Sequence, residues 1–154
     1  MSGYYGPVLK TGCFFFNKDK QNTLASRMAD LSGIIFQKQL GTMAEKSERI
    51  AALASFLAEL LDPSLQEDAV RSARLAKVDL LTEMVGEFPS LQGIIGRDYA
   101  LLDGEKPAVA QAIHEHYLPV RAGGELPESL LGALVGMADR IDTLVGCFAI
   151  GERP

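Results

Sequence analysis

The side chains that could bind a metal ion most readily are those of His114 and His116, the only histidines in the chain. Imidazole is the commonest metal ligand in proteins. On a regular helix, however, side chains two positions apart point about 200° from each other, so they cannot chelate one ion as an i, i+4 pair would. We therefore expect these histidines to have a surface or capping role near Pro119 and to form no metal site.

A row of cations could bind phosphate. Arg71, Arg74 and Lys77 follow one another at steps of three, which places them at neighbouring positions of one helical face. Such a row is suited to the backbone of an RNA. The alternative is a solvated face whose cations pair with nearby acids, namely Glu67, Asp68 or Glu83.

Arg97 is a further candidate for RNA contact. It lies in the segment Gly93-Ile94-Ile95-Gly96-Arg97-Asp98-Tyr99, after two glycines and close to an aromatic residue. This pattern suits contact with an RNA backbone or a base, and it suits close helix packing equally well. Together with the row on the preceding helix, the RNA-contact candidates are Arg71, Arg74, Lys77 and Arg97.

Motifs for other chemistries are absent from the sequence. It contains no glycine-rich phosphate loop, no Gly-x-Ser-x-Gly nucleophile elbow and no Cys/His nucleophile pair. Cys13 and Cys147 lie at opposite ends of the chain, which gives neither a disulfide framework nor a zinc-site spacing and fits a cytoplasmic location. We therefore predict no catalytic residue in this chain.

Composition is that of an ordinary globular protein, with 154 residues of which 47% are hydrophobic and 23% charged. No apolar run approaches the roughly 20 residues that span a bilayer, so no membrane partner is expected. The net charge is −5, and the acids concentrate in residues 62–154. A module that binds nucleic acid by itself normally has a basic surface. Any RNA contact should therefore be local, or lie mainly on other domains.

Apolar spacing is helical nearly throughout, and no alternating strand pattern stands out. It predicts an all-α, bundle-like domain of about six helices. The predicted helices run from Leu24 to near Gly41, from Met43 to Leu61, from Ser64 to Phe88, from Leu91 to Leu102, from Pro107 to Tyr117, and from Pro127 to Phe148.

The predicted domain covers residues 22–154. Residues 1–21 are expected to form a separate N-terminal segment, partly extended or foreign to the natural chain. Within the predicted third helix, Ala69, Ala73 and Ala76 have side chains too small to hold a neighbour far away. That helix should therefore pack closely at the centre of the domain.

Two segments place a carboxylate beside an apolar helical stripe, and thus at the edge of a core. They are residues 78–89, VDLLTEMVGEFP, and residues 137–144, MADRIDTL. In this order they resemble the central region of the bacterial glycyl-tRNA synthetase beta subunit. Further blocks in family order are residues 14–20, 27–42, 91–96, 113–119 and 146–151. The resemblance covers most of residues 8–154 and implies an excised central fragment.

That region is in turn similar to the HD-type helical domain of metal-dependent phosphohydrolases. Those enzymes hold a divalent cation with a His, a His-Asp dyad and a distal Asp. On this resemblance Lys46 and Val78 occupy the two histidine positions, whereas Asp79 and Asp139 are retained. Because both imidazoles are missing and an ammonium repels a cation, we expect no metal and no phosphohydrolase activity. Asp79 is expected to pair with Lys46.

The resemblance to the synthetase implies a part of glycine–tRNA ligase, which joins glycine to its tRNA at the expense of ATP. Implied partners are the glycine-specific tRNA, an alpha subunit in an alpha–beta assembly, and neighbouring beta-subunit domains. Because the family's adenylate-forming site lies in the alpha subunit, no catalytic residue is carried over. This chain is expected to hold no cofactor, to be inactive alone, and to support tRNA recognition and assembly.

Two other functions remain open at this point. One is an active HD-type phosphohydrolase of nucleotides, which would need histidines at positions 46 and 78. The other is a generic helical protein-interaction module. Binding of tRNA that weakens as salt rises would separate the synthetase fragment from the interaction module.

Overall fold

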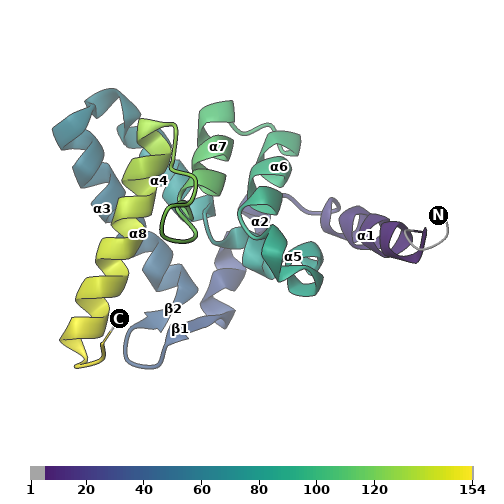
Figure 1. The fold of residues 1–154 in the computed structure, drawn as a ribbon, viewed down its shortest axis with the longest axis horizontal. Coiled ribbons are helices and arrows are strands. Elements are labelled where there is room, and N and C mark those ends of the chain that lie inside the picture. Colours follow the sequence, from purple (N-terminus) through teal and green to yellow (C-terminus); the bar gives the residue numbers. More distant parts are fainter. Residues whose placement is uncertain (1–5, 154) are drawn as a thin grey trace.

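The computed structural model of the chain describes residues 6–153, with side chains from residue 10 onwards. Figure 1 shows that most of this range is helical, which confirms the all-α class. The helices are α1 (Gly6–Asp19), α2 (Leu24–Arg27), α3 (Met43–Leu61), α4 (Gln66–Leu75), α5 (Glu83–Glu87), α6 (Ile94–Leu102), α7 (Pro107–Glu115) and α8 (Leu130–Ala149). No helix in the described range is long and apolar enough to cross a membrane.

The predicted first helix is shorter than expected, and a β-hairpin follows it. Helix α2 continues as a 3-10 turn only to Gly33, and the strands β1 (Ile35–Gln37) and β2 (Gly41–Thr42) pair in antiparallel fashion. The side chain of Gln37 closes the turn by accepting hydrogen bonds from the backbone N–H groups of Gln39 and Leu40. Gly41 has a φ of 88°, a left-handed conformation that favours glycine.

The predicted third helix is broken into α4, a 3-10 turn (Val78–Leu81) and α5. Thr82 causes the second break, because its Oγ1 accepts the Val85 N–H and so begins a new helix. The predicted close packing is confirmed, since Ala69, Ala73 and Ala76 are all fully buried.

The N-terminal segment, expected to be partly extended or foreign to the natural chain, is helical over residues Gly6–Asp19. Helix α1 packs against α5 through its C-terminal part, while its start projects from the body (Figure 1). Asp19, at the end of α1, is buried and accepts the backbone N–H groups of Glu83 and Met84 at the start of α5. This carboxylate attaches α1 to the domain.

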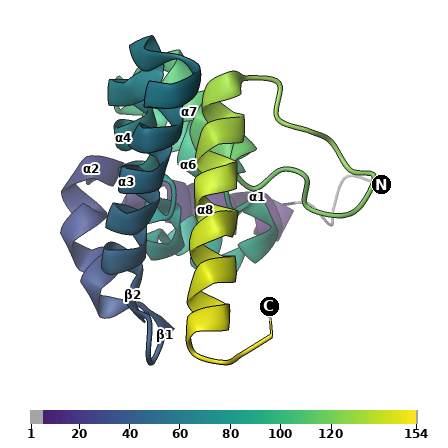
Figure 2. The same cartoon turned by 90° about the vertical axis from the view of Figure 1, so that its left-hand side faces the viewer.

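The core has two parts. An alanine-rich part lies between α3, α4 and α8, and it includes Ile50, Ala51, Ala54, Ala58, Leu134, Val135 and Ala138. A second part lies around α2, α6 and α7, and it includes Leu24, Leu31, Leu75, Val78, Tyr99 and Ile113. The small side chains of the first part let α3 and α8 lie side by side, as Figure 2 shows. That contact positions the charged side chains described next.

Candidate functional site

Two cations on α3 meet two carboxylates on α8 inside the domain. Lys46 and Arg49 are three residues apart on α3, and Asp139 and Asp142 are three residues apart on α8, so each pair lies on one face of its helix. The start of α3 contacts the end of α8, because the two helices run antiparallel. With Lys77, these four residues form what we call the ion-pair cluster.

Lys46 lies at the centre of the ion-pair cluster and is 2% exposed. Its Nζ lies 2.9 Å from Asp142 Oδ2 and 3.1 Å from Asp139 Oδ1. The same ammonium donates a hydrogen bond to Thr143 Oγ1 at 2.9 Å. These oxygens satisfy the three N–H donors of the ammonium group.

Lys77 and Arg49 each give one of the two carboxylates a second cation partner. Lys77 Nζ lies 2.7 Å from Asp139 Oδ2, and Arg49 Nε lies 2.6 Å from Asp142 Oδ1. Burial raises the pKa of Asp139, but the charge and hydrogen bond of Lys77 and the charge of Lys46 outweigh it and hold that pKa at about 2. Burial also raises the pKa of Asp142, but hydrogen bonds from Arg49 and Lys46 and their charges outweigh it and hold that pKa below its ordinary value. Both carboxylates are thus ionised and already bound by protein cations.

Two aromatic rings cover the buried ammonium groups. The ring centroid of Phe36, on β1, lies 4.3 Å from Lys46 Nζ, and that of Tyr117 lies 4.4 Å from Lys77 Nζ. The negative faces of the rings favour a cation at this distance. The hairpin therefore helps to hold Lys46 in place.

Of the positions that the HD-type resemblance aligns with metal ligands, only Lys46 and Asp139 meet, as an ion pair 3.1 Å apart. Within residues 6–153, no group of three or more His, Cys, Asp or Glu side chains is arranged to hold a metal ion. Val78, at the second histidine position, is fully buried in the apolar core. The carboxylates of Asp139 and Asp142 are bound by Lys46, Lys77 and Arg49, and carboxylates bound in this way fit a divalent cation poorly.

The expected pair between Asp79 and Lys46 does not form. Asp79 is fully buried and turns towards α6, where its Oδ2 accepts the Gly93 N–H at 2.6 Å. A Cβ at Gly96 would lie 3.1 Å from this oxygen, so a glycine there lets the first turn of α6 approach the carboxylate closely. Asp79 therefore stabilises the start of a helix, while Lys46 faces α8.

Replacing Asp79 with asparagine should change the pH dependence of stability. Burial raises the pKa of Asp79 from 3.8 to about 6. Its contribution to stability is therefore full below pH 3.8 and is lost as pH rises through 6. An amide keeps the acceptor for Gly93 but does not titrate, so Asp79→Asn should gain about 2 kcal/mol relative to the natural chain between pH 4 and pH 7. Urea unfolding at both pH values measures this gain, and parallel profiles would contradict it.

Of the two roles expected for the histidines, the surface position is wrong for His116, whereas the capping role fits it, because it is the C-cap residue of α7. This side chain is 1% exposed at the end of α7, and its Nδ1 donates to the Ile113 carbonyl oxygen. Burial lowers the pKa of His116 to about 3, and the charge of Lys77 acts in the same direction. His116 is therefore a neutral packing residue, while His114 is half-buried.

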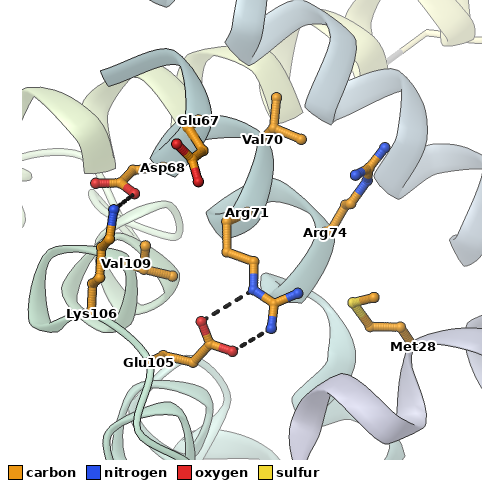
Figure 3. Close-up of a pocket in the computed structure, with 9 residues that line it drawn as sticks. All are labelled: Met28, Glu67, Asp68, Val70, Arg71, Arg74, Glu105, Lys106 and Val109. Carbon is orange, nitrogen blue, oxygen red and sulfur yellow. Dashed lines mark hydrogen bonds and ion pairs between the residues drawn. The ribbon is translucent and has the colours of Figure 1, made fainter. Parts of the chain in front are cut away.

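Arg71 and Arg74 lie on α4 and line a pocket of about 360 Å³ (Figure 3). Both are paired, but with acids distant in sequence. Arg71 makes two hydrogen bonds to the carboxylate of Glu105, and Arg74 makes two to Glu48, at 2.9 and 3.1 Å. About two fifths of each arginine side chain stays exposed, so a phosphate could still reach them.

The other two RNA-contact candidates lie elsewhere. Helix α4 ends at Leu75, so Lys77 leaves the face of Arg71 and Arg74 and turns inward, where it is 5% exposed. Arg97 is half-buried on α6 and donates to Asp98 Oδ1 at 2.8 Å. The structure therefore brings together two of the four candidates and separates the others.

Sequence reasoning missed several residues on which the domain depends. Asp142 and Arg49 could have been found from the three-residue spacing that pairs them with Asp139 and Lys46. Glu115 is buried and accepts the backbone N–H groups of Glu128 and Ser129, and so holds the chain that leads into α8. No local pattern signals this last contact, because its partners lie 13 and 14 residues away.

Comparison with known proteins agrees with the resemblance seen in the sequence. The family described as "Glycyl-tRNA synthetase beta subunit" matches residues 7–154. The chain is 55% identical over 141 residues to the glycine–tRNA ligase beta subunit of Trichlorobacter lovleyi, which covers 92% of this chain and 20% of the relative. It is 51% identical over 148 residues to that of Alteromonas mediterranea, which covers 96% of this chain and 21% of the relative. The chain thus spans about one fifth of these relatives' length, and it belongs to the glycyl-tRNA synthetase beta subunit family.

Proposed function

We propose that this chain is a helical part of the glycine–tRNA ligase beta subunit that supports tRNA recognition and domain assembly. In the complete enzyme, glycine is joined to its tRNA at the expense of ATP, with an alpha subunit as partner, in the cytoplasm. The part formed by this chain acts as a scaffold and carries no catalytic group and no cofactor of its own.

One observation carries the scaffold role, namely the burial of Lys46 between Asp139 and Asp142. A buried charge pair is costly to break, so the cluster fixes the register of α3 against α8. The same contacts leave neither carboxylate free to bind a cation or to accept a proton from water. A structural role is therefore favoured over hydrolysis.

Support for a local RNA contact comes from Arg71 and Arg74. Their guanidinium groups lie on the same helix, remain partly exposed, and border a pocket. Arginine is suited to phosphate because its planar group can donate two parallel hydrogen bonds. A phosphate there would compete with Glu105 and Glu48, so binding by this chain alone should be weak.

The test combines aminoacylation with tRNA binding. With glycine, ATP and tRNA, the chain alone should charge nothing, because no adenylate-forming group is expected in it. It should bind tRNA weakly, with an affinity that falls as salt rises. Arg71→Gln with Arg74→Gln should weaken binding several-fold, whereas the matched Arg121→Gln, on the exposed α7–α8 connection, should not. Charging by the chain alone, or binding that ignores salt, would contradict the proposal.

Two alternatives predict different results in the same assays. An HD-type phosphohydrolase would hydrolyse nucleotides in the presence of a divalent cation, and the occupied carboxylates of the ion-pair cluster argue against it. A generic protein-interaction module would bind no tRNA at any salt concentration. Membership of the synthetase family favours the scaffold over both.

A further inference from the structure

Helix α8 carries an apolar stripe on its outer face. Leu130, Met137 and Leu144 follow at intervals of seven residues, and they are 47%, 48% and 44% exposed. Phe148, four residues after Leu144, is 69% exposed. Because seven residues make almost two helical turns, these side chains form a continuous line about 27 Å long at 1.5 Å per residue.

A groove between α3 and α8 lies beside this stripe. Its volume is about 580 Å³, and its apolar lining includes Leu40, Leu53, Ile141 and Val145. Figure 2 looks onto the side of the molecule where α3 and α8 lie next to each other. Ile141 of the groove lies four residues after Met137 and three before Leu144, so these side chains are neighbours on α8. The groove therefore adjoins the stripe, and together they form a surface that we call the α3/α8 face.

We propose that the α3/α8 face is the docking site for an amphipathic helix of the same beta-subunit polypeptide, from a region outside these 154 residues. This inference rests on the proposed function and names the surface used for domain assembly. A helix fits because seven-residue spacing of apolar side chains is the pattern with which one helix packs along another.

The length of the relatives favours the same polypeptide as the source of that helix. The matched segment is about one fifth of each relative, so about four fifths of the polypeptide lies outside it. A helix tied to the domain by its own chain has an effective concentration up to the millimolar range, far above that of a separate molecule. A covalently linked helix would therefore occupy the face first.

The charges around the groove argue against RNA as the occupant. Arg49 and Asp142 line the groove, but they bind each other at 2.6 Å within the ion-pair cluster. The stripe itself is made of Leu, Met and Phe side chains, which offer no donor to a phosphate. The α3/α8 face is complementary to an apolar partner surface and not to a polyanion such as RNA.

Photo-crosslinking can test this in a complete beta subunit. This chain would replace the matched segment of the Trichlorobacter lovleyi relative, with a benzophenone amino acid at Leu144 or, as the matched control, at Leu102. Leu102 is 66% exposed on α6, away from the α3/α8 face. We expect crosslinks from position 144 to a peptide of the same polypeptide outside the 154 residues, and none to that peptide from position 102.

Crosslinking from position 144 to a second copy, to an alpha subunit or to tRNA would overturn the proposal, as would no crosslink at all. Aminoacylation by the unlabelled hybrid with an alpha subunit, measured in parallel, tests the proposed function separately. Normal charging without the internal crosslink would overturn the docking site alone, and failure to charge with the crosslink present would count against the function alone.

A second measurement does not depend on labelling. Met137→Glu with Leu144→Glu should lower the melting temperature of the 154-residue chain only slightly, because about half of each side chain is exposed there. In the complete hybrid subunit the same pair should lower it by several degrees, since it would place charges in a buried interface. Leu102→Glu should change neither protein. Equal effects of the double variant on both proteins would contradict the docking site.

Discussion

Replacing Lys46 with methionine should lower the free energy of unfolding by about 3 kcal/mol, because it removes the buried ammonium that both carboxylates share. Lys46 is 2% exposed and binds both Asp139 and Asp142. Methionine fills a similar volume, so the loss should reflect charge and hydrogen bonding rather than a cavity. Lys77 and Arg49 still neutralise one carboxylate each. The expected loss of stability therefore lies at the lower end of the range measured when a buried ion pair is broken.

Urea unfolding of Lys46→Met and the natural chain at pH 7 measures this loss. Lys106→Met is the matched control, since Lys106 also forms a Lys–Asp pair, with Asp68, but 65% of its side chain is exposed. The control should unfold almost as the natural chain does. If the two methionine variants lost equal stability, the ion-pair cluster would not be the main link between α3 and α8.

Replacing Asp19 with alanine should cost about 4 kcal/mol and release α1 from the body. The buried carboxylate of Asp19 accepts hydrogen bonds from the N–H groups of Glu83 and Met84 and from the Tyr99 hydroxyl. Each buried donor left without an acceptor costs about 1–3 kcal/mol. Arg27, 3.8 Å from the same carboxylate, would also lose its counter-charge.

Hydrogen exchange of α1 amides and urea unfolding together check this prediction. Asp19→Ala should lose protection in the C-terminal half of α1, and Asp19→Asn should recover part of the stability because its amide keeps one acceptor oxygen. Asp30→Ala, at an exposed position, should stay within about 0.5 kcal/mol of the natural chain. Unchanged protection of α1 in Asp19→Ala would show that packing of Phe15 and Phe16, rather than Asp19, holds the helix.

Elements with strong local signals were predictable from the sequence. Helix α3 was predicted from Met43 to Leu61, and the structure gives the same bounds. Its first turn is held by a capping box between Thr42 and Glu45, and Asp62-Pro63 ends it. The close packing of Ala69, Ala73 and Ala76 was also predictable, because side chains this small at helical spacing cannot hold a neighbouring helix far away.

Elements that depend on tertiary contacts were not predictable in this way. The strands β1 and β2 have three and two residues, too few for an alternating pattern to appear. The break before α5 depends on Thr82, and a helix-period pattern continues across it. In such segments the local pattern is compatible with a longer helix, and long-range packing determines where the helix ends.

The candidate site was partly predictable. The sequence singled out Lys46 and Asp139, which lie 3.1 Å apart, but it paired Lys46 with the wrong aspartate. The HD-type resemblance aligns Asp79 with a metal ligand. Such an alignment does not show that the side chain of Asp79 faces α6. The role of Asp79 at the start of α6 depends on how Gly93 and Gly96 approach it across 14 or more residues of chain.

Calorimetric titration of the chain with manganese chloride tests the central claim most directly, namely that Lys46 joins α3 to α8 by binding Asp139 and Asp142 and leaves neither carboxylate free for a metal ion. We predict heats no larger than those of dilution, and no rise in melting temperature on adding the metal. Stoichiometric binding at micromolar or lower concentration, lost in Asp139→Asn, would contradict it.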